Sequence, residues 1–143
     1  MKLNRALAEK NRLARKIKDL QSKITSHNSY IKGNKPVYDI TELIGDLEKT
    51  IKEIIDIKVK IATANLEVVD QVYRLSELKS YSGFLKGLTI KEGKVQEEKW
   101  NSDVHEWESA MGNKRRDTIV EGNEIEIETI QTEMDRFNFE TEI

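Results

Sequence analysis

The sequence predicts an all-α fold: a long antiparallel helical hairpin elaborated into a bundle of four or five helices, with a short extended C-terminal tail. Two long stretches carry apolar residues in alternating steps of three and four, the spacing of a coiled-coil seam. The 143 residues include one proline and seven glycines, and the charged fraction is 35% against 37% hydrophobic. That balance favours long helices with narrow apolar stripes. The length suits one helical domain over residues 1–143.

The first helix is expected over residues 2–26. Its seam residues follow alternating steps of three and four, and they are Leu3, Ala6, Lys10, Leu13, Ile17, Leu20 and Ile24. A helix of this length spans roughly 35 Å. The stretch "TSHNSYIKGNKPVYD" that ends at Asp39 contains Gly33, Asn34 and Pro36, which predicts a loop.

The second helix is expected to begin after Asp39 and to end at Asn65. Asp39 can cap free backbone amides, Glu42 stands three residues on, and Tyr38 and Leu43 are placed for a hydrophobic staple. The same rhythm continues through Ile40, Ile44, Leu47, Ile51, Ile54, Lys58, Ile61 and Asn65. Because a short break separates two matching stripes, the two helices should fold back as an antiparallel hairpin.

The signal weakens after the second helix. The letters "LEVVDQ" fit either a turn or a continuation of the helix. A third helix is indicated by Val72, Leu75, Leu78, Leu85 and Leu88, with Gly83 and Gly87 weakening its end. The letters "TIKEGK" predict a loop.

The last third of the chain predicts two further helices. A short one has one face made of Trp100, Val104, Trp107 and Met111, and the loop "GNKRRDT" follows it. In the next segment "EIEIET" alternates like a strand, whereas Ile127, Ile130, Met134 and Phe137 step like a helix. The longer period covers more residues, so a helix is expected over about 124–137. The sequence does not tell how residues 89–123 pack.

The charges are distributed unevenly along the chain. Residues 1–35 hold ten lysines and arginines against two acidic residues, and residues 121–143 hold eight acidic residues against one arginine. A basic end can serve as a surface for nucleic acid or another anion. We favour the alternative that the two ends pack together and neutralise each other. Asn138 is expected to stop the last helix in a left-handed conformation, with "FETEI" extended along the bundle, and Asn65 to end the second helix in the same way.

Both ends of the chain resemble a known family. The opening "MKLNRALAEKNRLARKI", the connection "IKGNKPVYDITELI", the stretch "KIATANL" and the closing "FNFETEI" are similar to motifs of the septicolysin-like family of small bacterial and phage proteins. The resemblance covers residues 1–65 and 137–143 and implies a helical protein. Where members of that family tend to carry Arg and Thr, this chain has Lys10 and Ala64.

Two lysines occupy positions in the predicted seams. In a hairpin that turns near Gly33, Lys10 lies opposite Lys58, and two cations in an apolar layer are costly unless they are paired. In one interpretation both side chains extend along the stripe and reach water. In the other, the layer is a polar pocket for an anionic small molecule such as a nucleotide or phosphorylated compound, with Asn65 and Asn138 adding amide contacts.

The sequence offers no reaction signature. It has no cysteine, and the only histidines, His27 and His105, lack the partners of a zinc site, so we predict no catalytic residue, metal or cofactor. Trp100 and Trp107 fit a stacking platform for bases, but core or subunit packing is the favoured interpretation. No segment is apolar enough for a membrane span, and a cytoplasmic location without nucleic acid is expected.

The predicted function is therefore a non-enzymatic one. Narrow apolar stripes on long helices usually need neighbours, which favours a self-associating helical protein that acts in binding or assembly, as a homo-oligomer. The resemblance adds an accessory role in a phage as an expectation. The alternative is a protein that binds or sequesters an anionic small molecule.

Overall fold

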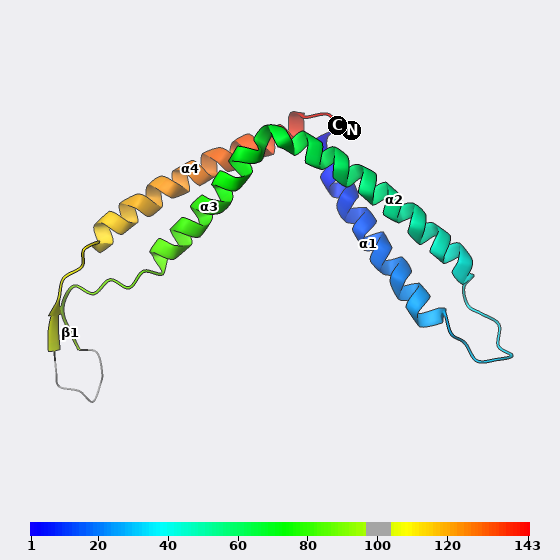
Figure 1. The fold of residues 1–143 in the computed structure, drawn as a ribbon. Helices are drawn as coiled ribbons and strands as arrows, with labels where there is room; N and C mark the ends of the chain where they lie inside the picture. The colour runs from blue at the N-terminus through cyan, green and yellow to red at the C-terminus, as the bar shows by residue number, and fades with distance from the viewer. Residues whose placement is uncertain (97–103) are drawn as a thin grey trace. The chain divides into compact units, whose positions relative to one another are not determined.

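A computed structural model describes residues 1–96 and 104–143 of the chain (Figure 1). Its elements are α1 (Leu3–His27), α2 (Ile40–Asn65), the 3-10 turn η1 (Leu66–Val68), α3 (Val69–Lys86), β1 (Gly93–Gln96), β2 (Val104–Trp107) and α4 (Asn113–Glu140). The chain divides into two compact units, which are described separately below. Unit 1 is Met1–Glu67 with Arg136–Ile143, and unit 2 is Val68–Asp135. The mostly helical composition confirms the all-α class in general, whereas the single domain stays a prediction.

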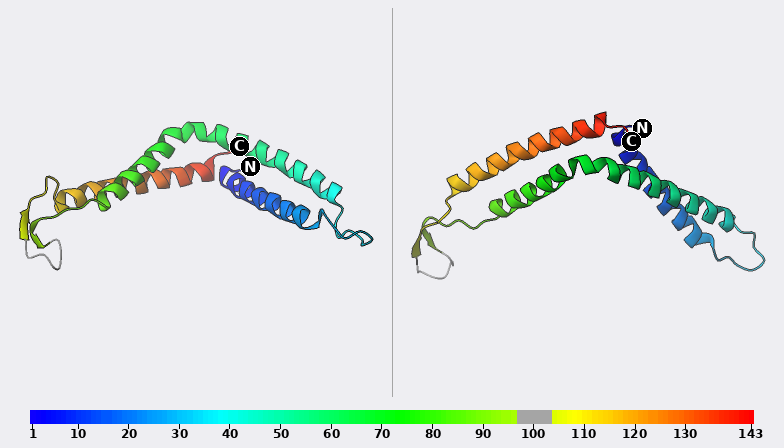
Figure 2. Two further views of the ribbon diagram at one scale, coloured as in Figure 1. Left: turned by 60° about the horizontal axis from the view of Figure 1, so that its bottom comes forward. Right: turned by 45° about the horizontal axis from the view of Figure 1, so that its top comes forward.

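The antiparallel hairpin of α1 and α2 is the core of unit 1, and the two helices run side by side in Figure 1 and in the left view of Figure 2. The buried positions of α1 are Leu3, Ala6, Leu13 and Leu20, as the predicted seam requires. Leu3, Ala6 and Leu13 form one cluster with Ile54, Ile57 and Ile61 of α2, against which Phe137 and Ile143 from the end of the chain also pack. The predicted bundle of four or five helices is not confirmed, because this cluster is built on one helical pair.

The start of α2 has the predicted chemistry. The Asp39 side chain accepts a hydrogen bond from the backbone N–H of Glu42, at 3.3 Å. A capping carboxylate satisfies one of the free amides that every helix start leaves. The cap therefore defines where α2 begins after the loop.

The buried row of α2 differs from the predicted one. The row that faces α1 contains Thr50, Ile54, Ile57 and Ile61. Ile44 and Ile51, which were expected in the seam, are 42% and 37% exposed, and Lys58 is exposed while Ile57 is buried. The physical reason is that α2 carries two apolar rows side by side. The narrow apolar row of α1 can cover the row with Ile57 but not the row with Ile44 and Ile51 as well.

The two asparagines do not end helices in the predicted way. Asn65 is the last residue of α2, but Leu66 keeps a right-handed helical conformation and η1 leads directly into α3. Asn138 lies inside α4, which continues to Glu140. No residue other than glycine has a positive φ in the described parts of the chain. The extended tail is consequently only Thr141–Ile143.

In unit 2, α3 matches its prediction and α4 exceeds it. α3 ends at Lys86, before Gly87, as expected. α4 begins at Asn113, so the predicted loop "GNKRRDT" is wrong. The predicted helical period of the last segment is right, because Ile130 is buried while Ile127, Met134 and Phe137 are half-buried on the same face. A single long helix replaces the predicted loop and the helix expected over 124–137, because no proline interrupts residues 113–140.

A β-hairpin occupies part of the segment for which a helix was predicted. β1 pairs antiparallel with β2, and Gly93 lies opposite Trp107 in the register. The predicted helical face with Val104 and Trp107 is therefore wrong, and Trp100 lies outside the described residues. The predicted loop "TIKEGK" is partly strand. Gly93 begins β1 with a φ of 77°, which favours glycine.

Candidate functional site

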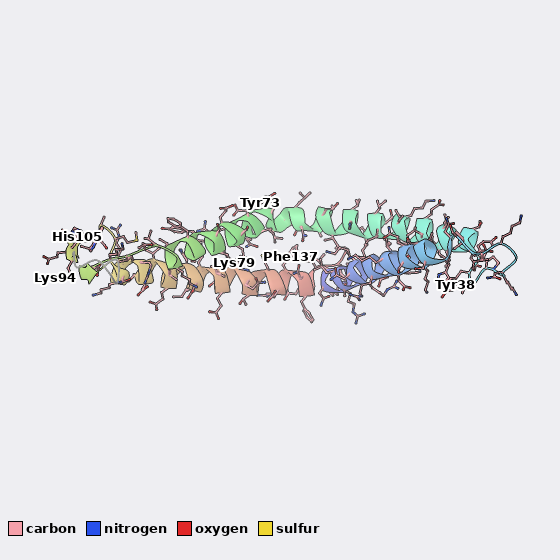
Figure 3. All side chains as sticks on the ribbon, turned by 90° about the horizontal axis from the view of Figure 1, so that it is seen from below. Tyr38, Tyr73, Lys79, Lys94, His105 and Phe137 are labelled. Atoms are coloured by element: carbon pink, nitrogen blue, oxygen red, sulfur yellow. The ribbon has the colours of Figure 1, made fainter. Side chains whose placement is uncertain are left out.

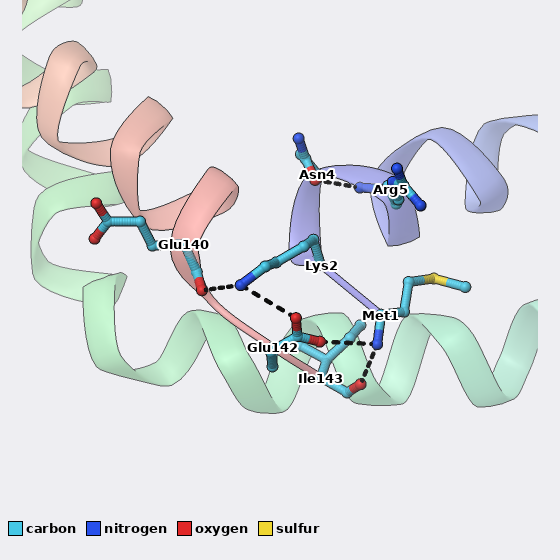
Figure 4. Close-up of polar contacts among 7 residues, drawn as sticks. All are labelled: Met1, Lys2, Asn4, Arg5, Glu140, Glu142 and Ile143. Atoms are coloured by element: carbon cyan, nitrogen blue, oxygen red, sulfur yellow. Dashed lines mark hydrogen bonds and ion pairs between the residues drawn. The ribbon is translucent and has the colours of Figure 1, made fainter.

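The two ends of the chain meet in unit 1 (Figure 4). The N–H of Leu3 donates to the carbonyl of Thr141, and the N–H of Ile143 donates to the carbonyl of Met1, both at 2.9 Å. Lys2 and Glu142 form the antiparallel bridge between these bonds. The predicted meeting of the basic beginning and the acidic finish is confirmed at this junction.

Charge also contributes to the junction. The Glu142 carboxylate lies 2.9 Å from the terminal amine of Met1 and 3.1 Å from Nζ of Lys2. Hydrogen bonds from the terminal amine, and then from Lys2, hold the pKa of Glu142 below its usual value. Lys2 also donates to the backbone carbonyl of Glu140, at 3.0 Å. All three charged groups at this junction are exposed to water, so they fix geometry more than they add stability.

Neutralisation between the two ends goes no further than these ion pairs among the described residues. In α1, Arg12 pairs with Glu9 and Lys23 pairs with Asp19. The acidic side chains of α4 instead meet α3 within unit 2, where Lys86 contacts Glu124 at 2.6 Å. Arg74 of α3 pairs with Glu126 of α4 in the same way. The excess charges at the two ends of the chain therefore have different partners.

The four predicted ligand residues all lie in unit 1, on different elements. Lys10 is half-buried on α1, Lys58 is exposed on α2, and Asn65 and Asn138 are half-buried near the ends of α2 and α4. A cavity of about 280 Å³ in this unit is lined by none of them. Its lining residues are Met1, Glu9, Leu13, Glu53, Asp56, Ile57, Lys60 and Ile143. Three carboxylates in that lining oppose the binding of an anion there.

The most distinctive surface of unit 1 is an apolar row on α2, which we call the outer stripe. Its residues and exposed fractions are Ile44 (42%), Ile51 (37%), Ile55 (52%), Val59 (59%) and Leu66 (69%). At 100° per residue these five positions fall within an arc of about 80°, beside the row that faces α1. This surface could have been predicted from the sequence, because one seam cannot bury all the isoleucines of this part of α2, which are Ile51, Ile54, Ile55 and Ile57.

Unit 2 also leaves apolar side chains exposed. Tyr73 and Phe84 of α3 are 68% and 65% exposed, and Tyr73 projects from the side of α3 away from α4 (Figure 3). The other exposed apolar residues of α3 are Val69, Val72 and Tyr81. At 100° per residue these five positions spread over an arc of about 180°, so they form a more scattered surface than the outer stripe. Within the same unit Ser82 is 4% exposed, and its hydroxyl has no hydrogen-bond partner among the described residues.

The β-hairpin of unit 2 borders a cavity of about 490 Å³, which is lined by Leu88, Thr89, Lys91 and residues 107–111. Nζ of Lys91 lies 4.7 Å from the centre of the Trp107 ring. The hydroxyl of Ser109 donates to the carbonyl of Lys91, at 2.8 Å. Because a cation already covers the ring, Trp107 is placed as a packing residue more than as a platform for bases.

The described residues contain no group of three or more His, Cys, Asp or Glu side chains that could hold a metal ion. His27 contacts the Lys23 carbonyl through Nδ1, at 3.1 Å, and packs edge-on against Tyr38. None of the helices described is both long enough and apolar enough to cross a membrane. Comparisons of the chain with protein-family models, curated proteins and solved structures give no match.

Proposed function

We propose that this chain is a non-enzymatic helical protein that acts in binding or assembly by associating with itself. The outer stripe is the observation that carries the proposal. Rows of contiguous apolar side chains on a surface mark interaction sites, whereas single exposed apolar residues are ordinary. Five such residues on one arc of α2 therefore favour a partner.

The balance of apolar side chains supports the same proposal. Among the described residues, twelve hydrophobic residues are buried and eighteen large hydrophobic residues are exposed. A pair of helices has a narrow core, and helices with a second apolar row usually bury it against further helices. Association of two hairpins would produce the four-helix bundle that the sequence predicts.

The test is the molar mass in solution over a wide range of protein concentrations. Light scattering after size exclusion, from about 1 to 500 μM, should give a mass that rises above 16.6 kDa with concentration. A mass that stays at 16.6 kDa throughout that range would refute self-association. The resemblance to septicolysin-like proteins supports an accessory role in a phage as the setting for such an assembly.

The alternative is that the chain takes an anionic small molecule at Lys10, Lys58, Asn65 and Asn138. One observation favours it: neither lysine forms an ion pair with a residue that the structure describes. A thermal-shift screen with nucleotides and phosphorylated compounds tests it. A rise in melting temperature that disappears in Lys10→Ala and Lys58→Ala would support the alternative, and no rise with any compound would refute it.

A further inference from the structure

The outer stripe has a symmetry along the helix. Its residues Ile44, Ile51, Ile55, Val59 and Leu66 are separated by steps of seven, four, four and seven. The same steps are met in either direction from Ile55. Leu66 has the right-handed helical conformation of the residues before it, so the stripe continues past the end of α2 without a break.

We propose that the outer stripe is the docking surface for a second copy of this chain, which binds antiparallel about a two-fold axis at Ile55. This inference rests on the proposed self-association and names its surface. In this register Ile55 meets Ile55, Ile51 meets Val59, and Ile44 meets Leu66. A two-fold contact requires a surface that is complementary to itself, and the palindromic spacing supplies it.

The residue Glu48 and the helix dipole both favour the antiparallel orientation over the parallel one. Glu48 lies within the arc of the stripe, between Ile44 and Ile51, and the two-fold register places Ala62 of the second copy opposite it. A parallel contact in register would instead place the Glu48 carboxylates of the two copies beside each other, and like charges repel. Opposed helix dipoles add to the preference.

The size of the stripe also fits a partner. The exposed fractions of its five residues correspond to roughly 450 Å² of surface per copy, the size of the largest apolar patch on a typical monomer, which is often functional. Each partner in an interface of standard size contributes about 800 Å². Glu48 within the stripe and Lys52 beside it would supply part of the remainder. The contact is therefore expected to depend on protein concentration.

Single cysteines test the register directly, because the natural chain has no cysteine. Under mild oxidation, Ile55→Cys should form a disulfide-linked dimer by itself, since a residue on the axis meets its own copy. A mixture of Ile44→Cys and Leu66→Cys should give more mixed dimer than either variant gives dimer alone. Ile125 is 62% exposed on α4 and lies outside the stripe. Ile125→Cys is therefore the matched control and should stay largely uncrosslinked.

A charge substitution supplies the second readout. Ile55→Glu should weaken self-association by at least tenfold, and Ile125→Glu should leave it within about twofold. Circular dichroism and melting temperature establish that both variants fold. If the natural chain associates but Ile55→Cys does not crosslink and Ile55→Glu associates normally, the inference fails while the proposed function stands. A natural chain that is monomeric at every concentration overturns both.

Discussion

Substitution of two isoleucines on the same helix separates the buried row of α2 from the outer stripe. Ile57 is 9% exposed and Ile51 is 37% exposed. Replacing isoleucine by alanine removes three carbon groups, worth about 0.8 kcal/mol each when they are fully buried, and leaves a cavity in addition. Alanine returns a few tenths of a kcal/mol as the better helix former at both positions. Ile57→Ala should therefore lower the free energy of unfolding by about 2–3 kcal/mol, and Ile51→Ala by less than about 1 kcal/mol.

Urea denaturation followed by circular dichroism at 222 nm measures both values. The protein must be dilute enough to be monomeric, because an associated state would add the loss of its own contacts to the effect of Ile51→Ala. Mass measurement in the same buffer provides that control. Equal losses for the two variants, or a larger loss for Ile51→Ala, would contradict the arrangement in which Ile57 faces α1.

Four further predictions probe the fold. Ser82→Ala should raise the free energy of unfolding by about 1 kcal/mol in urea denaturation, since a buried hydroxyl without a partner costs desolvation; a loss of stability would point to an unseen partner. Asp39→Ala should lower the free energy of unfolding by about 1 kcal/mol through the lost helix cap, and an unchanged midpoint would refute the cap. The pKa of Glu142 is lowered in the folded state. The ionised side chain therefore adds to the free energy of unfolding above its unfolded pKa, and this contribution is lost as the pH falls through the folded pKa. Glu142→Gln should flatten the stability profile below about pH 4.5, and an identical profile would exclude the junction. Phe137→Ala should destabilise more than Phe139→Ala by calorimetry, because Phe137 packs on the core cluster and Phe139 is 68% exposed.

The sequence was sufficient to predict α1 and the start of α2, because each signal there has one interpretation. The α1 seam has one apolar row between charged faces, and Asp39 is a capping residue at a helix start. In α2 the three-four spacing predicts Ile51 and Lys58 in the seam, whereas the structure buries Thr50 and Ile57. The predicted row and the buried row share Ile54 and Ile61, so periodicity alone could not decide between them.

The errors elsewhere have local causes. Trp107 and Val104 are three residues apart, a spacing that fits a helix, but aromatic and β-branched residues also favour strands and the hairpin uses them in that way. Asn138 was expected to stop the last helix, yet asparagine only tolerates the left-handed conformation and the helix continues to Glu140. The candidate ligand site required Lys58 in the seam, but the structure buries Ile57 there and leaves Lys58 exposed.

The hairpin of α1 and α2 has two sides that differ in how they are covered. On the first, the narrow core gains Phe137 and Ile143 from the end of the chain, and the hydrogen bonds of Leu3 with Thr141 and of Ile143 with Met1 fix that segment in place. A segment that is distant in sequence therefore supplies apolar surface that two helices lack. On the second side α2 presents a row of comparable length, and no segment of unit 1 buries it. If selection acted only on the stability of one copy, isoleucines at positions 44, 51 and 55 would bring little benefit over polar residues. Their presence is best explained by a surface that is buried after the chain has folded, which is the physical basis for proposing a second copy as its partner.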